Sequence, residues 1–203
     1  MADKLMIYYQ NCRGLRTKLH ILFMNILSNC YDIIILTETW LTPEILDSEF
    51  IDQRYSVHRC DRDRKATQKK DGGGTLIVIL KGLGSVTIES SISLNQHIED
   101  VVLRIPSAAR GNYDIICSAY IPPNTAESVY VAYLELLLLR VKLFKISICL
   151  VITISPILFG DYNLPDIVWL FTGGSGFIQD SNNRSSQTSI HINIFMSIFN
   201  AFQ

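Results

Sequence analysis

The sequence lacks most of the features that would place it in a specialised class of protein. Its five cysteines are scattered and form no CxxC pair, which argues against a zinc ribbon or a thioredoxin-type redox pair. Residues 1–11 lack the apolar stretch and small-residue cleavage site of a signal peptide, so we take the mature chain to start at Met1. Charge is nearly balanced, with 18 Lys and Arg against 19 Asp and Glu, so any basic surface must be local. We expect an intracellular, reducing compartment.

Long apolar runs are also scarce. The most apolar region, 131–159, is interrupted by three basic residues, and its uncharged part, 146–159, contains Pro156. This part is shorter than the ~20 residues that a helix needs to span a bilayer, so we expect no membrane partner. The chain is 48% hydrophobic and 18% charged, which is typical of a globular domain.

Two strand–helix–strand units are expected. In the first, residues 4–11 read as a strand, apolar residues recur at helical spacing from Leu15 to Leu27, and residues 32–40 begin with a β-branched run. The second has a strand at 113–124. A helix over 126–144 and a strand within 148–163 complete this second unit. Strands joined in this way are parallel, so their carboxyl ends meet at one edge of a sheet, where ligands bind in α/β proteins.

The region between the two units is locally basic. Residues 54–71 contain seven Lys or Arg against three Asp and are followed by the glycines 72–74, so we expect an exposed basic loop. Apolar runs at 75–80, 85–90 and 98–105 then predict three strands, close enough in sequence to form an antiparallel meander.

Polar side chains follow four of the expected strands at their carboxyl ends. These residues are Asn11, Glu38, Tyr120, and the pair Asp161 and Asn163. Taken singly, each has an ordinary structural explanation, such as a strand-end cap, packing against a proline or an Asx-turn. Together, carboxylate and amide oxygens at one edge are the ligands that Mg²⁺ prefers, and Mg²⁺ sites are completed by substrate phosphates. Phosphodiester cleavage is the chemistry that this set indicates.

Several short segments support that interpretation. They include "QNCRGLRTK", "LTETWL", "GGGTLIVI", "YIPPN" and "GDYNLP", in this order along the chain. In these segments the sequence resembles the endonuclease/exonuclease/phosphatase family, and within it the apurinic-type endonuclease domains of non-LTR, LINE-like retrotransposons. The resemblance covers most of residues 4–169. It implies an α/β (α+β) fold, a four-layer sandwich of two packed mixed β-sheets flanked by helices.

The resemblance also implies roles for the strand-end residues. Glu38 would be the principal ligand of Mg²⁺, or of Mn²⁺, and Asn11 would support the metal or the scissile phosphate. Tyr120 would contact the phosphate, Asp161 would orient and deprotonate the attacking water, and Asn163 would help to position that water.

DNA is the partner that the resemblance implies. Arg13, Arg59, Arg62 and Arg64 are the candidate contacts to DNA phosphates. A functional retrotransposon endonuclease would work in the nucleus.

The expected domain spans residues 1–169, in line with the extent of the resemblance. No reverse transcriptase motif occurs in the sequence.

The tail departs from the family. Residues 170–203 lack the Ser-Asp-His stretch that ends the family's domain, and no Asp precedes His191. We therefore expect a fold that is incomplete at its C-terminus, with a divergent or truncated tail. Three functions stay open: a DNA-nicking endonuclease, an inactive remnant that only binds nucleic acid, and a phosphoesterase of another branch of the family.

Overall fold

The strands form two four-stranded sheets and a separate two-stranded ribbon. The computed structural model describes residues 5–68, 71–87, 98–107, 113–147, 154–161, 169–171 and 177–179. The first sheet has the order β1-β2-β4-β3, the second β5-β6-β7-β8, and the ribbon pairs β10 with β9.

The elements of the first sheet and its helices are β1 (Ile7–Asn11), α1 (Leu19–Ser28), β2 (Ile33–Thr37), β3 (Tyr55–Cys60), α2 (Arg64–Thr67) and β4 (Thr75–Leu80). The elements that follow are β5 (Val86–Thr87), β6 (Glu99–Pro106), β7 (Tyr113–Tyr120), α3 (Glu127–Ser147), β8 (Ile154–Asp161), β9 (Trp169–Phe171) and β10 (Phe177–Gln179). Two short 3₁₀ turns, η1 (Asp47–Glu49) and η2 (Lys81–Leu83), complete the set.

Strand β2 is buried on both faces because it lies between a helix and the second sheet. Its side chains alternate, so Ile34 and Leu36 pack in the cluster that contains Leu22 and Ile26 of α1. Its other face packs against strands β6 and β7 of the second sheet. A run of apolar residues without polar alternation is what burial on both faces requires.

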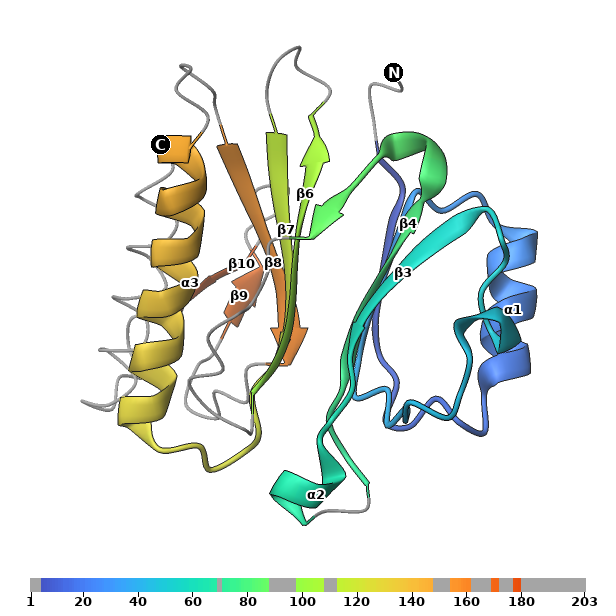
Figure 1. Cartoon of the computed structure of the whole chain (residues 1–203), viewed down its shortest axis with the longest axis horizontal. Helices are drawn as coiled ribbons and strands as arrows, with labels where there is room; N and C mark the ends of the chain where they lie inside the picture. Colours follow the sequence, from blue (N-terminus) through green and yellow to red (C-terminus); the bar gives the residue numbers. More distant parts are fainter. Residues whose placement is uncertain are drawn as a thin grey trace.

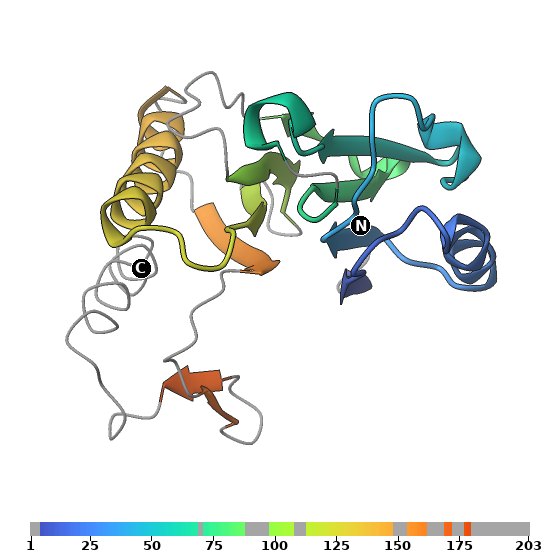
Figure 2. The ribbon, with the colours of Figure 1, turned by 90° about the horizontal axis from the view of Figure 1, so that it is seen from below.

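The molecule has four layers. In Figure 1 the two sheets pack face to face, with α1 outside the first sheet and α3 outside the second. Seen from below in Figure 2, α1 and α3 again lie on opposite sides, and β9 and β10 lie away from both sheets. No helix in the described ranges is both long enough and apolar enough to cross a membrane.

The strand pairing confirms the two predicted strand–helix–strand units. Strands β1 and β2 are parallel, and so are β7 and β8. The predicted fold class, two packed mixed sheets flanked by helices, is confirmed.

Two expectations for the middle of the chain are wrong. Residues 54–71 are not simply an exposed loop, because they contain β3 and α2, and Arg62 is buried. The three following strands do not form a meander, because β4 pairs antiparallel with β2 and β3 in the first sheet, whereas β5 and β6 pair in the second. Apolar alternation identifies a strand but does not specify its partner.

Candidate active site at the shared edge of the two sheets

The strand ends identified from sequence gather at one edge of the sandwich. The carboxyl end of β2 pairs with the start of β4, and the carboxyl end of β7 pairs with the start of β6. Two contacts join the sheets at this edge: Thr75 Oγ1 and Ser118 Oγ are 2.5 Å apart, and Arg62 binds Glu99. The carboxyl ends of both parallel strand pairs therefore share one edge, the lower one in Figure 1, where β8 ends and α2 lies.

The segments that follow β1 and β2 run side by side. The Gly14 amide donates to the Glu38 carbonyl, and the Leu15 amide donates to the Thr39 carbonyl, each at 2.8 Å. This backbone pairing continues the parallel ladder beyond the last strand residues and keeps Glu38 next to the segment that follows Asn11. The two expected metal ligands therefore come from adjacent chain segments.

Backbone strain is concentrated at this edge. Arg13, Glu38 and Trp40 have φ angles of 46°, 51° and 55°, in the left-handed region that residues with a Cβ rarely occupy. Gly14 lies between them at φ 88°, and a Cβ there would come within 2.8 Å of the Trp40 ring. Each such residue costs on the order of 1–3 kcal/mol, and strain of this kind clusters at functional sites.

The two residues that follow Glu38 carry buried polar atoms. Thr39 Oγ1 and Trp40 Nε1 have no hydrogen-bond partner among the described residues. Folded proteins satisfy most buried polar atoms, and the exceptions often mark a place where a ligand, an ion or a water acts. Glu38 itself is partly exposed.

One cysteine at this edge, Cys12, is poorly suited to act as a nucleophile. Cys12 follows Asn11 and is buried, and burial raises the pKa of its thiol to about 11. The positive charge of Lys18 lowers this pKa and the negative charge of Glu38 raises it. Because the thiolate is the reactive form, Cys12 stays in its unreactive thiol form at neutral pH.

The donor set at the edge suits one hard divalent cation. Glu38 supplies carboxylate oxygens, and the Asn11 side-chain oxygen, which accepts the Arg13 amide at 3.1 Å, is held in place by that bond. Within the described part of the chain, no three His, Cys, Asp or Glu residues form a closed metal cage. One carboxylate and one amide oxygen fit Mg²⁺, which keeps several waters and shares its site with substrate phosphates.

The second sheet brings three residues into register at the same edge. Tyr120 lies opposite Glu99 of β6 on one side and opposite Asp161 of β8 on the other. Tyr120 is buried, with 5% exposure. The backbone of Asp161 is thus adjacent to Tyr120, whereas Asn163 lies outside the described residues.

A buried ion pair spans the two sheets beside Tyr120. Arg62 Nε donates to Glu99 Oε1 at 2.8 Å, and Arg62 Nη2 donates to Glu99 Oε2 at 3.3 Å. The guanidinium also lies 5.1 Å from the centre of the Tyr120 ring. Burial opposes the charge of Arg62, but hydrogen bonds with Glu99 and Tyr120 raise the pKa of the guanidinium overall. Sequence reasoning missed Glu99, although a carboxylate in an otherwise apolar strand is a signal that a buried partner exists.

The three glycines before β4 leave room for Arg62 and for Thr39. A Cβ on Gly73 would lie 2.4 Å from the Arg62 guanidinium, and one on Gly72 would lie 3.1 Å from its Nη1. A Cβ on Gly74 would lie 2.6 Å from Thr39 Oγ1. At residues 72–74 the backbone therefore turns and also passes close to the side chains of Arg62 and Thr39.

The remaining arginines of the predicted DNA surface differ in exposure. Arg59 is paired with Asp47 at 2.9 Å and with Asp61 at 3.3 Å, and its side chain is 18% exposed. Arg13 is exposed and Arg64 is partly exposed. Arg13 and Arg64 are thus accessible to solvent, whereas Arg59 is paired with carboxylates.

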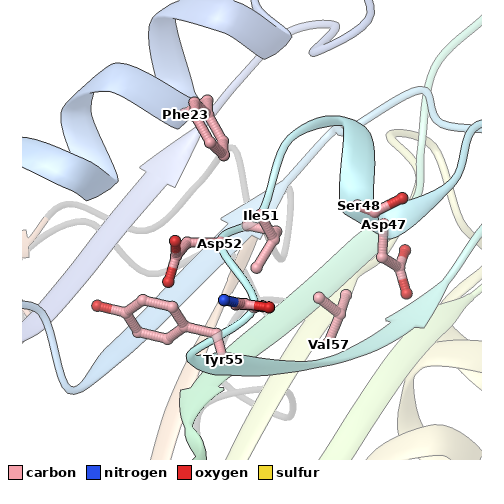
Figure 3. Close-up of a pocket in the computed structure, with 8 residues that line it drawn as sticks. Phe23, Asp47, Ser48, Ile51, Asp52, Tyr55 and Val57 are labelled. Carbon is pink, nitrogen blue, oxygen red and sulfur yellow. The ribbon is translucent and has the colours of Figure 1, made fainter.

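A separate pocket lies away from this edge, beneath α1. Its volume is about 360 Å³, and it lies between α1, η1 and β3. Figure 3 shows Phe23 on the helix above Ile51, Asp52, Tyr55 and Val57. The pocket shares no residue with the candidate active site.

Comparison with solved structures finds this fold in the endonuclease/exonuclease/phosphatase group. The endonuclease domain of TRAS1, a telomere-specific non-LTR retrotransposon, is 13% identical with a TM-score of 0.54, over 96% of this chain and 71% of that chain. An AP endonuclease from Archaeoglobus fulgidus is 16% identical with a TM-score of 0.56, over 96% and 71%. The human nocturnin catalytic domain is 16% identical with a TM-score of 0.53, over 78% and 64%.

These similarities establish the fold, and they confirm the resemblance at that level. The chain spans 64% of the nocturnin domain and 71% of the two endonuclease structures. No model of a known protein family matches the sequence, and no curated protein matches it.

Proposed function

We propose that the chain is a Mg²⁺-dependent endonuclease domain that hydrolyses phosphodiester bonds in DNA, of the kind found in retrotransposon endonuclease/reverse transcriptases. The observation that carries this proposal is that the strand ends bearing Asn11, Glu38 and Tyr120 lie at the same edge of the two sheets, beside the Arg62–Glu99 pair. The fold shared with TRAS1 and an AP endonuclease supports the choice of DNA as substrate. Residues 1–169 are the proposed catalytic domain, and the nucleus is its proposed location.

The metal site in this proposal is made by Glu38 and Asn11. A bound Mg²⁺, or Mn²⁺, would neutralise charge that develops on the scissile phosphate. Glu38 supplies the negative charge that holds the cation, and its left-handed backbone fixes the direction in which its side chain leaves the strand end. Asn11 adds a neutral oxygen on the adjacent strand.

The proton-transfer groups come from the second sheet. Asp161 accepts the proton of the attacking water as the new P–O bond forms, and Asn163 holds that water. The bond from phosphorus to the leaving oxygen breaks, and that oxygen takes up a proton from solvent water. Tyr120 donates its hydroxyl hydrogen bond to a phosphate oxygen, where negative charge grows in the transition state. Arg13 and Arg64 contact neighbouring phosphates of the DNA.

Nicking of supercoiled plasmid tests the proposal. The purified chain is incubated with plasmid and Mg²⁺, and the conversion to open circles is compared with Glu38→Gln, Asp161→Asn and a sample in EDTA. Glu135→Gln is the matched control, because it removes a carboxylate from an exposed position of α3. Nicking that requires Mg²⁺, Glu38 and Asp161 but not Glu135 supports the proposal. Nicking that survives Glu38→Gln refutes the metal site.

The two other candidate functions make different predictions in the same assay. An inactive nucleic-acid binder retains plasmid in EDTA and in Glu38→Gln, without nicking, and its affinity falls steeply with salt. A phosphoesterase of another branch leaves the plasmid intact and releases phosphate from a panel of phosphoinositides, sphingolipids or nucleotides.

A further inference from the structure

Arg62 is buried far more deeply than its place in a basic run predicts. Its side chain is 6% exposed and that of Glu99 is 5% exposed. Burying two charges is costly, and apolar replacements of such pairs are often neutral or stabilising. Stability alone is therefore a weak reason for this pair to exist.

The second contact of Arg62 suggests another reason. Glu99 and Tyr120 face each other on β6 and β7, and the guanidinium, which comes from the segment between β3 and α2, contacts both of them. The carboxylate fixes the plane of the guanidinium through two hydrogen bonds, and that plane lies near the Tyr120 ring. Arginine is suited to this task because its fork is rigid and its planar face packs on aromatic rings.

The glycine run supports this arrangement independently. A Cβ at position 73 would overlap the guanidinium, and Gly72 and Gly73 have φ angles of 95° and 70°. The Arg62 side chain therefore fits in this place only because positions 72 and 73 are glycine. Both the partner and the space for Arg62 are provided by the fold.

We propose that Arg62, held by Glu99, is a positioning residue that orients Tyr120 toward the scissile phosphate. This inference rests on the proposed function for the role of Tyr120, and it assigns Arg62 to the interior of the site rather than to the DNA surface. The positive charge stays beside the phenol ring, where it also favours an anionic phosphate nearby.

The test compares Arg62→Lys with Tyr120→Phe and with the double variant. Lysine keeps the charge but cannot make the forked, stacked contact, so we expect kcat to fall about 10–100-fold with KM little changed. Because Arg62 acts through Tyr120, Arg62→Lys should cost less than about threefold once Tyr120 is Phe. Equal losses in both backgrounds overturn the proposal.

Arg64→Gln is the matched comparison, two residues away and on α2. As a phosphate contact, it should raise KM and reduce the salt dependence of DNA binding by about one unit of slope, whereas Arg62→Lys should leave that slope unchanged. A reduced slope in Arg62→Lys would return Arg62 to the DNA surface and overturn the proposal.

A measurement on the tyrosine itself separates this proposal from the proposed function. If Arg62→Lys does not fold, the paired change Arg62→Met with Glu99→Leu removes both charges together and is used instead. In protein labelled with ¹³C-tyrosine, the ring resonances of Tyr120 should shift and its ring flips should accelerate in either variant, while those of Tyr8, distant on β1, stay unchanged. An unchanged Tyr120 spectrum overturns the proposal even in a chain that does not nick DNA. An altered spectrum supports it in such a chain, where only the proposed function fails.

Discussion

Glu99 and Asp100 are neighbours on β6 and point to opposite faces of the sheet. Each of them binds an arginine on its own face. Glu99 points between the sheets and holds Arg62, which contacts Tyr120. Asp100 points toward α3, where it accepts a hydrogen bond from Arg140 at 2.7 Å and one from Tyr133 at 3.3 Å. The two faces thus carry the same three chemical groups, a carboxylate, a guanidinium and a phenol.

The surroundings of the two clusters differ. The Arg62 cluster lies at the edge where left-handed residues and glycines gather, whereas the Arg140 cluster lies under a regular helix with buried Leu134 and Leu137. Strain and special glycines are features of sites that bind or react, and regular packing is a feature of sites that only hold the fold. This difference supports the proposed role of the first cluster in the site and a structural role for the second.

The largest expected difference between the Arg62 edge and the Arg140 helix layer is the loss of nicking activity when a residue of the edge is changed. Glu38→Gln removes the charge that holds the cation, so nicking should fall by at least about 10²–10³-fold. Urea unfolding should give a free energy of unfolding within about 1 kcal/mol of the wild type, since Glu38 is partly exposed. Loss of folding instead of activity would make Glu38 structural.

The opposite result is expected at the helix layer. Arg140→Met leaves the buried Asp100 carboxylate without its cationic partner, since each side chain is 10% exposed, so the free energy of unfolding should fall by about 3–5 kcal/mol. Nicking per folded molecule should be unchanged below the new melting temperature. Activity lost in the folded variant would show that the helix layer also serves the site.

Much of this edge could be predicted from the sequence. The two strand–helix–strand units place Asn11, Glu38, Tyr120 and Asp161 at strand ends, because parallel connections leave little freedom in where those ends lie. The sequence could not show that β4 belongs to the first sheet. Strand partners are chosen by packing between residues distant in the chain, and β4 is apolar enough to be buried in either sheet.

The burial of Arg62 was harder to predict. A segment with seven basic residues in eighteen is usually a solvated surface, and only the pairing of Arg62 with Glu99, thirty-seven positions later, identifies one member as internal. The glycines 72–74 read as a breaker, since sequence alone gives no side chain for them to accommodate. Long-range contacts of this kind leave little trace in local composition.

Stabilisation of the protein by Mg²⁺ should depend on the edge that carries Glu38 and not on the helix layer that carries Arg140. Mg²⁺ at 100 times its dissociation constant should add about 2.7 kcal/mol to the stability of the wild type, because it binds only the folded state. The rise in melting temperature should be absent in Glu38→Gln and present in Arg140→Met, measured by differential scanning fluorimetry. A similar rise in all three proteins would show that Mg²⁺ binds elsewhere.

The smallest expected effect reports on the helix layer alone. Cys117 of β7 is buried with its Sγ 3.9 Å from the Tyr133 hydroxyl, and burial raises the pKa of its thiol, whereas Cys30 is exposed. Iodoacetamide should therefore modify Cys30 of the native protein within minutes and leave Cys117 unmodified, since the thiolate is the reactive form. In Arg140→Met, local opening of the layer should make Cys117 modification measurable by peptide mass spectrometry, and in Glu38→Gln it should stay protected. Equal protection of Cys117 in both variants would mean that the Asp100–Arg140 pair does not hold α3 on the sheet. The structural role given to the Arg140 cluster would then be wrong.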